Sequence, residues 1–229
     1  KNIRAAIRKP CEVALSEAEK IAETERRPIK TVCEEGEVYE RIVGIAEAEN
    51  CGIIVMGRRS KSRFERSLIG SVTARVIGHS QRDVLIVPEG TAIGWKNILL
   101  TTDGSKYSEA AADKAIDFAK SYGGELKVVS VVDVPSEYYA EAPKAVEDLI
   151  KKAKGFVGNL KEKAEASNIS TETFVGEGDA YKVITDLAKK EKADVIFMGS
   201  HGRTGIKRLL MGSVTEGVLG HALCPVLII

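Results

Sequence analysis

The chain has 229 residues, of which 44% are hydrophobic and 29% charged, and its 34 basic and 33 acidic residues leave a net charge of +1. This composition excludes an intrinsically disordered chain, because enough apolar surface is present to offset the entropy lost on folding. The charge balance shows no basic domain of the kind that nucleic-acid-binding proteins carry, and the longest apolar runs are too short to span a bilayer. We therefore expect neither a nucleic-acid nor a membrane partner.

Hydrophobic periodicity predicts alternating helices and strands along the chain. In the first part of the chain it predicts helices over residues 11–25, 38–49 and 71–78 and strands over residues 29–33, 53–56 and 84–87. In the second part it predicts strands over residues 97–101, 126–132, 171–175, 193–198 and 226–229 and helices over residues 108–122, 143–166, 180–190 and 213–220. We expect Asp179 to cap the helix at 180–190. This alternation is typical of right-handed βαβ units and predicts an α/β fold.

The two parts of the chain repeat one another without a gap. Met198-Gly199 lies 142 residues after Met56-Gly57, and the same offset relates Gly212-Ser213-Val214-Thr215 to Gly70-Ser71-Val72-Thr73. This period is far longer than that of a solenoid repeat, so it indicates a duplicated domain. We place the first copy at residues 1–90 and the second at residues 95–229.

The first copy is shorter than the second at its front. The second copy opens with the strand at 97–101, and about the first third of this domain has no counterpart in the first copy. Either the sequence is incomplete at its start or the first copy is a degenerate half-domain. We expect the former, because a parallel sheet that lacks its central strand would expose unpaired backbone and apolar faces. The predicted fold is two tandem Rossmann-like domains, each with a five-stranded parallel sheet flanked by helices, the first without its opening elements.

Four cysteines (Cys11, Cys33, Cys51 and Cys224) lie at unrelated spacings with no Cys-x-x-Cys pair. In a chain of this size we expect them to be small buried side chains in a reducing compartment, which predicts a cytoplasmic location. No cluster of cysteine and histidine has the spacing of zinc ligands, so we expect no metal held by protein side chains.

Polar loops follow two strands of the second copy. The strand at 97–101 leads into Thr101-Thr102-Asp103-Gly104-Ser105, and the strand at 193–198 leads into a glycine-rich loop and then a helix that opens at Gly212. Ligands of open α/β sheets bind beyond the carboxyl ends of the strands. Glycines let the backbone approach a ligand and adopt positive φ, and a helix N-terminus favours an anion. Each loop alone is more simply a tight turn or a helix cap, but their convergence on one sheet edge favours an anion site.

The side chains near these loops suit a phosphorylated ligand. The hydroxyls of Ser213 and Thr215 add donors, and Arg203, Lys207 and Arg208 could meet terminal phosphates. Asp103 could accept from ribose hydroxyls or hold a divalent ion through water. The chain has no Gly-x-x-x-x-Gly-Lys-Ser/Thr loop, which excludes a P-loop ATPase.

The spacing Gly199-x-x-Gly202, nine residues, then Gly212-Ser213 resembles the Gly-2x-Gly-9x-Gly-Ser/Thr signature of the universal stress protein family, in its ATP-binding branch. The Thr-Asp-Gly-Ser after the first strand, the Val-Val-Asp after the second and the closing Cys-Pro-Val-Leu-Ile are also similar to that family. The resemblance implies that ATP or AMP binds to the second copy, with Mg²⁺ held through the phosphates. The implied contacts to adenine and ribose are Thr101, Thr102, Asp103 and Val131. The implied contacts to the ribose and α-phosphate are Met198, Gly199, Ser200, His201, Gly202, Arg203, Thr204 and Gly205. The implied contacts to the outer phosphates are Gly212, Ser213, Val214 and Thr215.

The resemblance also implies a stress-response regulator that binds the nucleotide without rapid turnover. It implies an internal pseudo-dimer in which the last strands of the two copies, at 84–87 and 226–229, pair, and two chains could still form a homodimer. An adenylate-forming or slow ATP-hydrolysing enzyme and a nucleotide-free interaction scaffold remain as alternatives. No catalytic residue is assigned, because the sequence offers His201 no carboxylate partner for a general base. His79 and His221 are repeat counterparts near helix ends, where a cation suits the helix dipole.

The first copy departs from the family's spacing. Ser60 stands where the second glycine belongs, and a Cβ at that point would obstruct the backbone, so we expect nucleotide binding in the second copy. The surrounding loop is basic, and either a second anion or nucleic-acid patch or, as the neutral chain favours, a solvated loop would explain it. Its charged residues are Arg58, Arg59, Lys61, Arg63, Glu65 and Arg66.

Overall fold

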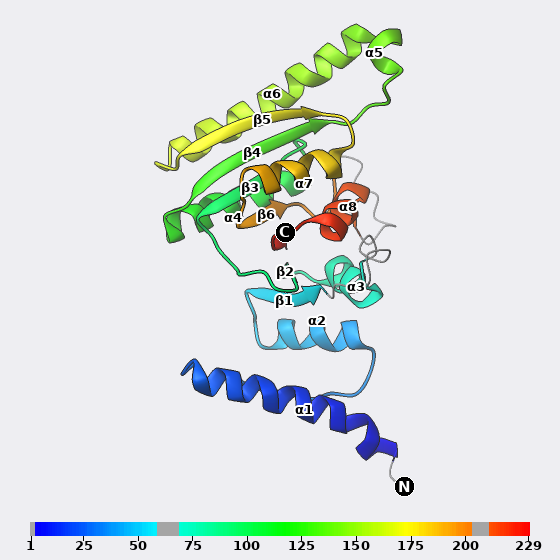
Figure 1. Ribbon diagram of the computed structural model, residues 1–229, viewed down its shortest axis with the longest axis vertical. Coiled ribbons are helices and arrows are strands. Elements are labelled where there is room, and N and C mark those ends of the chain that lie inside the picture. Colours follow the sequence, from blue (N-terminus) through cyan, green and yellow to red (C-terminus); the bar gives the residue numbers. More distant parts are fainter. Residues whose placement is uncertain (1–2, 59–68, 203–210) are drawn as a thin grey trace. The chain divides into compact units, whose positions relative to one another are not determined.

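The computed structural model of the protein describes residues 3–58, 69–202 and 211–229. The chain divides into two compact units, Lys1–Ile42 and Val43–Ile229. The larger unit is built on one seven-stranded sheet with the order β1-β2-β7-β6-β3-β4-β5 (Figure 1). The strands are β1 (Ile53–Arg58), β2 (Asp83–Pro88), β3 (Asn97–Thr101), β4 (Glu125–Val132), β5 (Thr171–Glu177), β6 (Val195–Met198) and β7 (Val226–Ile228).

The second copy forms the α/β sheet that the sequence predicts. Its five strands, in the order β7-β6-β3-β4-β5, are all parallel. The chain passes from β3 to β4 and β5 on one side and returns to β6 and β7 on the other side of β3. The strand order therefore reverses between β3 and β6, which is where a ligand site is expected in such a sheet.

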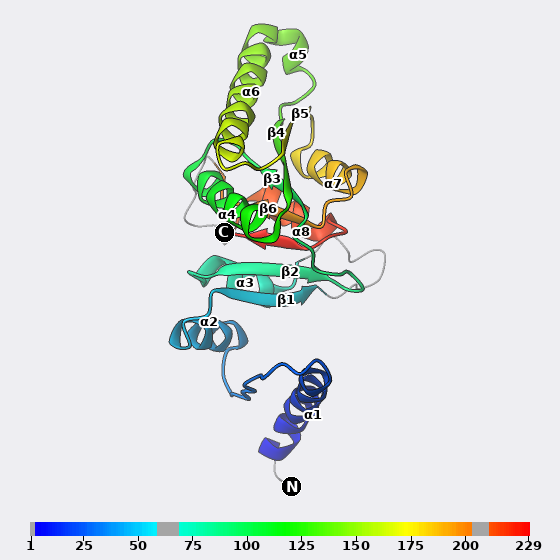
Figure 2. The same cartoon turned by 90° about the vertical axis from the view of Figure 1, so that its left-hand side faces the viewer.

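Helices cover both faces of this sheet. The elements are α3 (Ser71–His79), α4 (Lys106–Tyr122), α5 (Tyr138–Glu141), α6 (Pro143–Glu165), α7 (Ala180–Lys190) and α8 (Ser213–His221). Figure 2 shows α4 and α6 on one face and α7 on the other, where it packs against α8. Helix α4 begins after Ser105, whose side chain accepts from the Ser108 N–H, and ends at Gly123 with φ +61°. A hydroxyl cap and a left-handed glycine are the usual start and stop signals of a helix.

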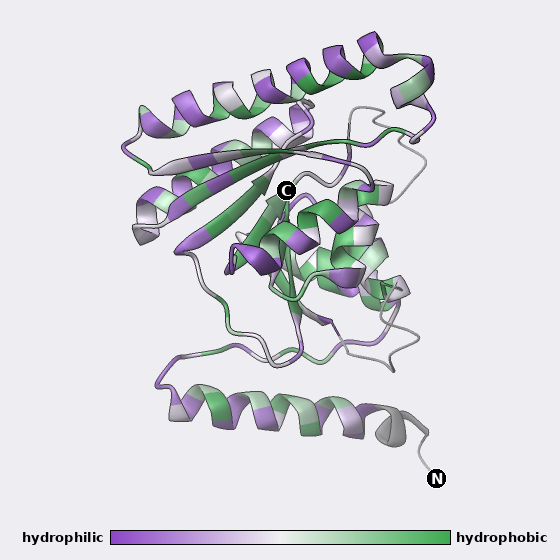
Figure 3. Ribbon diagram, turned by 45° about the horizontal axis from the view of Figure 1, so that its top comes forward, coloured by the Kyte–Doolittle hydropathy of each residue, from purple (hydrophilic) through white to green (hydrophobic). Residues whose placement is uncertain are grey.

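The core lies between the sheet and the face covered by α4 and α6. Ile98, Leu100 and Phe197 are fully buried there, packed against the small alanines of α4. Figure 3 shows the central strands as predominantly hydrophobic, whereas α6 alternates between hydrophilic and hydrophobic residues. A strand that is buried on both faces gives a continuous hydrophobic run, and a helix that is buried on one face gives a periodic pattern. These two patterns allowed the helices and strands to be located in the sequence.

The two copies join through their last strands. β2 pairs with β7 in antiparallel fashion, with Val84 opposite Ile228, Leu85 opposite Leu227 and Ile86 opposite Val226. Lys114 of α4 and Asp83 of β2 add an ion pair at 2.8 Å across the same contact. The expected pairing of the strands at 84–87 and 226–229 is confirmed.

The strand predicted at 29–33 is wrong, because those residues form no strand. In the second copy the counterpart strand, β5, is held by β4. The first copy has no counterpart of β4 in this sequence, so residues 29–33 have no neighbour with which to form a ladder. The counterpart of β1 in the second copy is β6, which lies between β7 and β3, and the first copy has no counterpart of β3 in this sequence. Among the strands described, β1 therefore pairs with β2 alone and lies at the sheet edge, where Val55 is 55% exposed.

The N-terminal unit contains α1 (Ile3–Thr24), and α2 (Val38–Ala48) begins in it. The segment after α1 returns along the helix and brings the Cα atoms of Cys11 and Cys33 to 6.3 Å, where the two cysteines form a disulfide. The expectation of four buried thiols is therefore wrong. Cys51 and Cys224 are free thiols, and both are only partly buried. Among the helices described, none combines the length and apolar composition that a bilayer span requires.

Candidate functional site

A cavity of about 420 Å³ lies at the carboxyl ends of β3, β4 and β6, where the N-termini of α7 and α8 also meet. Its volume is within the usual range for small-molecule sites. It is lined by Thr101, Thr102, Asp103, Ser108, Val129, Val131, Asp133, Ala180, Ile184, Met198, Gly199, His201, Gly202, Gly212, Ser213, Val214 and Thr215. Most of the residues expected from the sequence are thus brought together. Ser200 is not part of the lining, and Arg203, Thr204 and Gly205 lie outside the described residues.

The end of β3 presents a carboxylate held by its own turn. Thr101 and Thr102 are buried, and the Thr102 hydroxyl accepts from the Gly104 N–H at 3.2 Å. Asp103 Oδ1 accepts from the Ser105 N–H at 3.0 Å. Gly104 has φ +74°, a backbone conformation that side-chain-bearing residues rarely adopt. The turn therefore aims the Asp103 carboxylate at the cavity, where it can accept from hydroxyl groups.

The glycines of the loop after β6 act differently from the expectation. Neither Gly199 nor Gly202 has a φ in the left-handed region, so neither uses the freedom to adopt positive φ that the sequence allowed. A Cβ on Gly199 would lie 2.8 Å from the carbonyl carbon of Tyr107, and a Cβ on Gly202 would lie 3.0 Å from Asp103 Oδ2. Gly199 thus lets α4 pack against the loop, whereas Gly202 lets the loop approach the Asp103 carboxylate.

The N-terminus of α8 opens into the cavity. Its N-cap residue is Gly212, which has no side chain to satisfy the first turn, and the Gly212 N–H donates to Ser200 O at 3.0 Å. The first N–H groups of a helix have no intrahelical partner and attract anions. The sequence led us to expect the Thr215 hydroxyl to donate to a ligand. It donates instead to Gly199 O at 3.1 Å and so holds the loop.

The opposite end of the cavity lies between β4 and α7 and is mostly apolar. It is formed by Val129, Val131, Ala180 and Ile184 together with Asp133. Asp133 Oδ2 accepts from the Ala180 N–H at 3.2 Å. Asp179, the expected cap of α7, makes no capping bond and instead pairs with Lys182 at 3.0 Å. Five lining residues were not expected at the site: Ser108, Val129, Asp133, Ala180 and Ile184. Of these, only Asp133 had a signal in the sequence, the Val-Val-Asp at the end of β4.

The histidines fall into two groups. His79 and His221 each share a hydrogen bond between Nδ1 and the carbonyl four residues earlier, at 2.8 Å in both, so the expected structural role is confirmed. His201 Nδ1 lies 3.2 Å from the Ser200 hydroxyl, and its ring centroid is 5.4 Å from that of Tyr107. Within residues 3–58, 69–202 and 211–229, no three potential metal-ligating side chains of histidine, cysteine, aspartate or glutamate lie together.

The first copy shows a different use for its basic loop. Most of this loop lies outside the described residues, namely Arg59, Ser60, Lys61, Arg63, Glu65 and Arg66. Arg58 is half-buried, and its guanidinium donates to Leu219 O and, at 2.6 Å, to Ala222 O. Arg58 therefore belongs neither to a solvated loop nor to an anion patch, because it binds the C-terminal end of α8.

Comparisons with known proteins agree with this architecture. The sequence profile of the universal stress protein family matches residues 4–88 and 94–229. A universal stress protein of Methanocaldococcus jannaschii is 37% identical over 142 residues, which are 59% of this chain and 82% of that protein. The Bacillus subtilis universal stress protein YxiE is 30% identical over 149 residues, 59% of this chain and 99% of that protein.

Solved structures show the same fold. The crystal structure of a universal stress protein from Archaeoglobus fulgidus covers 98% of this chain and 77% of its own, with a TM-score of 0.74 and 24% identity. UspA from Lactobacillus plantarum covers 60% of this chain and 99% of its own, with a TM-score of 0.55 and 25% identity. The profile match extends over almost the entire sequence in two tandem segments. The chain therefore belongs to the universal stress protein family.

Proposed function

We propose that the second copy, residues 95–229, binds ATP or AMP in the cavity at the ends of β3, β4 and β6, and that the protein is a stress-response regulator without rapid turnover. The observation that carries this proposal is the convergence of three different surfaces on one cavity: the uncapped N-terminus of α8, the Asp103 carboxylate and the apolar slot between β4 and α7. An adenine nucleotide has a phosphate tail, a ribose and a flat base, which match these surfaces in turn.

The base and ribose fit the end of the cavity near β3 and β4. Val129, Val131 and Ile184 offer apolar contact to the faces of a purine. Asp103 can accept hydrogen bonds from the ribose hydroxyls, because its Oδ1 is already oriented by the Ser105 N–H. Asp133 adds a second carboxylate beside the slot. Two carboxylates at this end disfavour phosphate there, since like charges repel.

The phosphates fit the opposite end of the cavity. The backbone N–H groups at the start of α8 and the loop from Met198 to Gly202 face this end, and the helix dipole favours an anion by about 0.3–1 kcal/mol. Mg²⁺ bound through the phosphates would add neutralising charge without a dedicated set of protein ligands, which is common for this ion. These generic donors serve ATP and AMP alike, so both nucleotides belong to the proposal.

The test is Gly212→Val measured by calorimetric titration with ATP and with AMP. An added Cβ at Gly212 would have no atom closer than 3.7 Å, so the fold tolerates it while the side chain fills the phosphate end. We expect at least a tenfold loss of ATP affinity, about 1.4 kcal/mol. The matched control is Gly70→Val at the repeat-equivalent N-cap of α3, which should leave the affinity unchanged. Unchanged affinity in Gly212→Val with an intact circular dichroism spectrum would reject this site.

The same titrations separate the alternatives. Release of pyrophosphate or ADP within seconds would favour an adenylate-forming or ATP-hydrolysing enzyme. No binding of either nucleotide, together with no nucleotide extracted from gently purified protein, would favour an interaction scaffold. His201 Nδ1 lies beside the Ser200 hydroxyl and its ring lies beside that of Tyr107, an arrangement that supports a contact role for this histidine.

We also propose a cytoplasmic location. A reducing cytoplasm keeps most protein thiols reduced, so the Cys11–Cys33 bond should be open in the cell. Alkylation of acid-quenched cells followed by mass spectrometry should then find four modified cysteines. Protein with only Cys51 and Cys224 modified would argue for an oxidising compartment.

A further inference from the structure

We propose that Arg58 of the first copy is a positioning residue for the nucleotide site of the second copy, an inference that rests on the proposed function. Arg58 is the last residue of β1, and its guanidinium binds the two carbonyls at the C-terminal end of α8. The N-terminal end of that same helix forms the phosphate end of the cavity. One helix therefore connects a residue of the first copy to the site of the second.

The contact suits a residue that fixes the direction of a helix. The last carbonyls of a helix have no intrahelical partner and carry partial negative charge. Leu219 and Ala222 are buried, at 1% and 0% exposure, so a protein cation replaces water as the partner of their carbonyls. A guanidinium is a rigid fork that binds two acceptors at once, which fixes an angle as well as a distance.

Helix α8 is held at several points along its length, and Arg58 holds the end farthest from the cavity. The Thr215 hydroxyl ties the N-terminal turn to Gly199 O. In the middle of the helix, Gly217 packs so closely on Tyr181 that an added Cβ would lie 2.6 Å from the ring. Since a short helix moves as a rigid body, this close contact is a pivot. Movement of the C-terminal end would tilt the N–H groups that face the phosphates.

Arg58 affects the ligand by positioning α8, not by direct attraction between its charge and the phosphates. A nine-residue helix is about 13 Å long, so the Arg58 guanidinium and a phosphate at the other end of α8 are not in contact. Arg58 therefore acts on the ligand through the placement of the helix.

The arginine contact is present at α8 of the second copy and, among the residues described, has no equivalent at α3 of the first. The repeat offset makes Ser200 the counterpart of Arg58. A serine side chain is too short to make the reciprocal contact with the end of α3, and its hydroxyl lies beside His201 Nδ1 instead. The copy that receives the arginine contact is the one that keeps the Gly-2x-Gly-9x-Gly-Ser spacing.

The experiment compares Arg58→Met and Arg58→Lys with Arg82→Met in the full chain. Arg82 is the matched control, because it is a half-buried arginine of the first copy that bonds within that copy, to Asn50 Oδ1 at 3.0 Å. We expect Arg58→Met to lower ATP affinity at least fivefold, Arg58→Lys to recover part of the loss, and Arg82→Met to stay within twofold. Wild-type affinity in Arg58→Met would overturn the proposal, and so would an equal loss in Arg82→Met.

Hydrogen exchange of the nucleotide-free proteins separates this inference from the proposed function. We expect the amides of α8 to exchange at least fivefold faster in Arg58→Met, while those of α4 keep their rate. If the wild-type protein binds no ATP, the proposed function fails, and the exchange of α8 alone decides the positioning role. Unchanged exchange in α8 would overturn that role. If Arg58→Met does not fold, the comparison of Arg58→Lys with the wild type provides the same two readouts.

Discussion

Leu85 of β2 and Leu227 of β7 lie directly opposite each other in the antiparallel pair that joins the two copies. Leu227 follows Leu85 by the repeat offset, so each leucine faces its own counterpart. Val84 faces Ile228, the counterpart of Ile86, and Ile86 faces Val226, the counterpart of Val84, so the repeat exchanges these two pairs. A contact in which the same patch is used on both sides has twofold symmetry. The chain thus contains within itself the kind of contact that a symmetric dimer makes between two subunits.

Truncating this contact should destabilise the whole sheet. Leu85 is 1% exposed, so Leu85→Ala leaves a cavity at the centre of the seam and should lower the free energy of unfolding by about 2–5 kcal/mol. The measurement is urea denaturation followed by circular dichroism. Val55→Ala on β1 is the control, because Val55 is 55% exposed and should cost less than about 0.5 kcal/mol. Similar losses in the two variants would show that the seam contributes no more than the sheet edge.

The sequence was most informative where one segment decides its own structure. The predicted strand at 97–101 and helix at 180–190 coincide with β3 and α7, because both carry uninterrupted periodicity. Residues 29–33 have equally good strand composition but form no strand, since a strand also needs a neighbour. The Cys11–Cys33 bond was missed for a related reason, because the pairing depends on the path of the chain after α1.

The same distinction applies to the candidate site. Asp103, Gly202 and Gly212 were found because they belong to contiguous motifs at the ends of elements. Ile184 and Ser108 were missed because they reach the cavity from the sides of helices, and only the packing of α7 and α4 on the sheet brings them there. Asp133, not the expected Asp179, accepts from the first N–H of α7. The sequence does not show that β4, which Asp133 follows, ends beside the start of α7.

Gly199→Ala should destabilise the protein, although replacing a glycine by alanine outside the left-handed region usually stabilises a protein. A Cβ at Gly199 would lie 2.8 Å from the Tyr107 carbonyl carbon, and backbone at both residues would have to move. We expect a loss of about 1–3 kcal/mol in urea denaturation. The repeat supplies the control, Gly57→Ala, where an added Cβ has no atom within 4 Å and the change should stay below about 0.5 kcal/mol. Equal stability of the two variants would contradict a packing role for Gly199.

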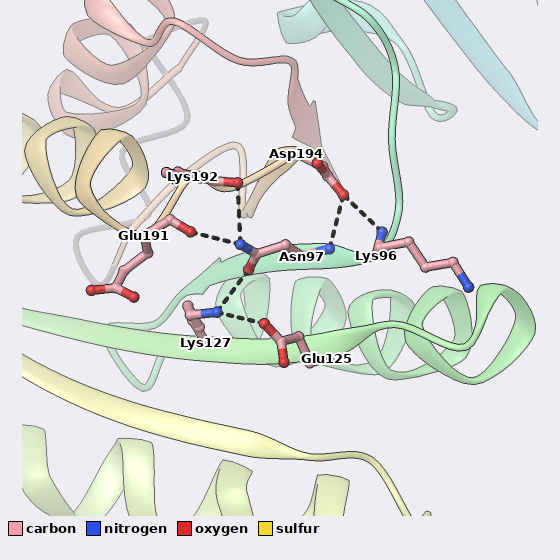
Figure 4. Close-up of polar contacts among 7 residues, drawn as sticks. All are labelled: Lys96, Asn97, Glu125, Lys127, Glu191, Lys192 and Asp194. Atoms are coloured by element: carbon pink, nitrogen blue, oxygen red, sulfur yellow. Dashed lines mark hydrogen bonds and ion pairs between the residues drawn. The ribbon is translucent and has the colours of Figure 1, made fainter.

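A polar network around the buried Lys127 holds the start of β3 at the sheet end opposite the cavity (Figure 4). Lys127 is 6% exposed, and its ammonium donates to Asn97 Oδ1 at 3.0 Å and to Glu125 at 2.7 Å. Asn97 Nδ2 donates to Glu191 O and Lys192 O, and Asp194 Oδ2 accepts from the N–H groups of Lys96 and Asn97.

Removing the Asn97 side chain should lower the free energy of unfolding more than removing the Lys127 charge does. Asn97→Ala leaves the buried Lys127 cation and two carbonyls short of partners, and we expect a loss of about 2–4 kcal/mol. Lys127→Met removes the cation and leaves two acceptors, the carboxylate of Glu125, whose side chain is 48% exposed, and Oδ1 of the half-buried Asn97. Water can bind both, so the loss should stay below about 1.5 kcal/mol. Urea denaturation of the two variants provides the comparison. A larger loss in Lys127→Met would mean that the ion pair itself stabilises the fold.

The stability of the protein should fall at alkaline pH through Cys224. Burial is the main cause that raises the pKa of the Cys224 thiol from 9.0 to about 11; the nearby Asp194 carboxylate acts in the same direction, and Arg58 acts against it. The folded state therefore keeps the thiol neutral at a pH at which the unfolded chain ionises it. This contribution is fully present below pH 9 and is lost as the pH rises from 9 to about 11, by on the order of 2 kcal/mol.

The difference between wild type and Cys224→Ala isolates this effect from the lysines and tyrosines that titrate in the same range. Urea denaturation at intervals from pH 8 to 11 should show the wild type losing its advantage over Cys224→Ala as the pH rises. Alkylation with iodoacetamide at pH 8 should also be slow at Cys224, since the thiolate is the reactive form and burial suppresses it. A pH-independent difference between the two proteins would mean that the thiol is solvated in the folded state, and that the end of α8 near Arg58 is more open than the structure shows.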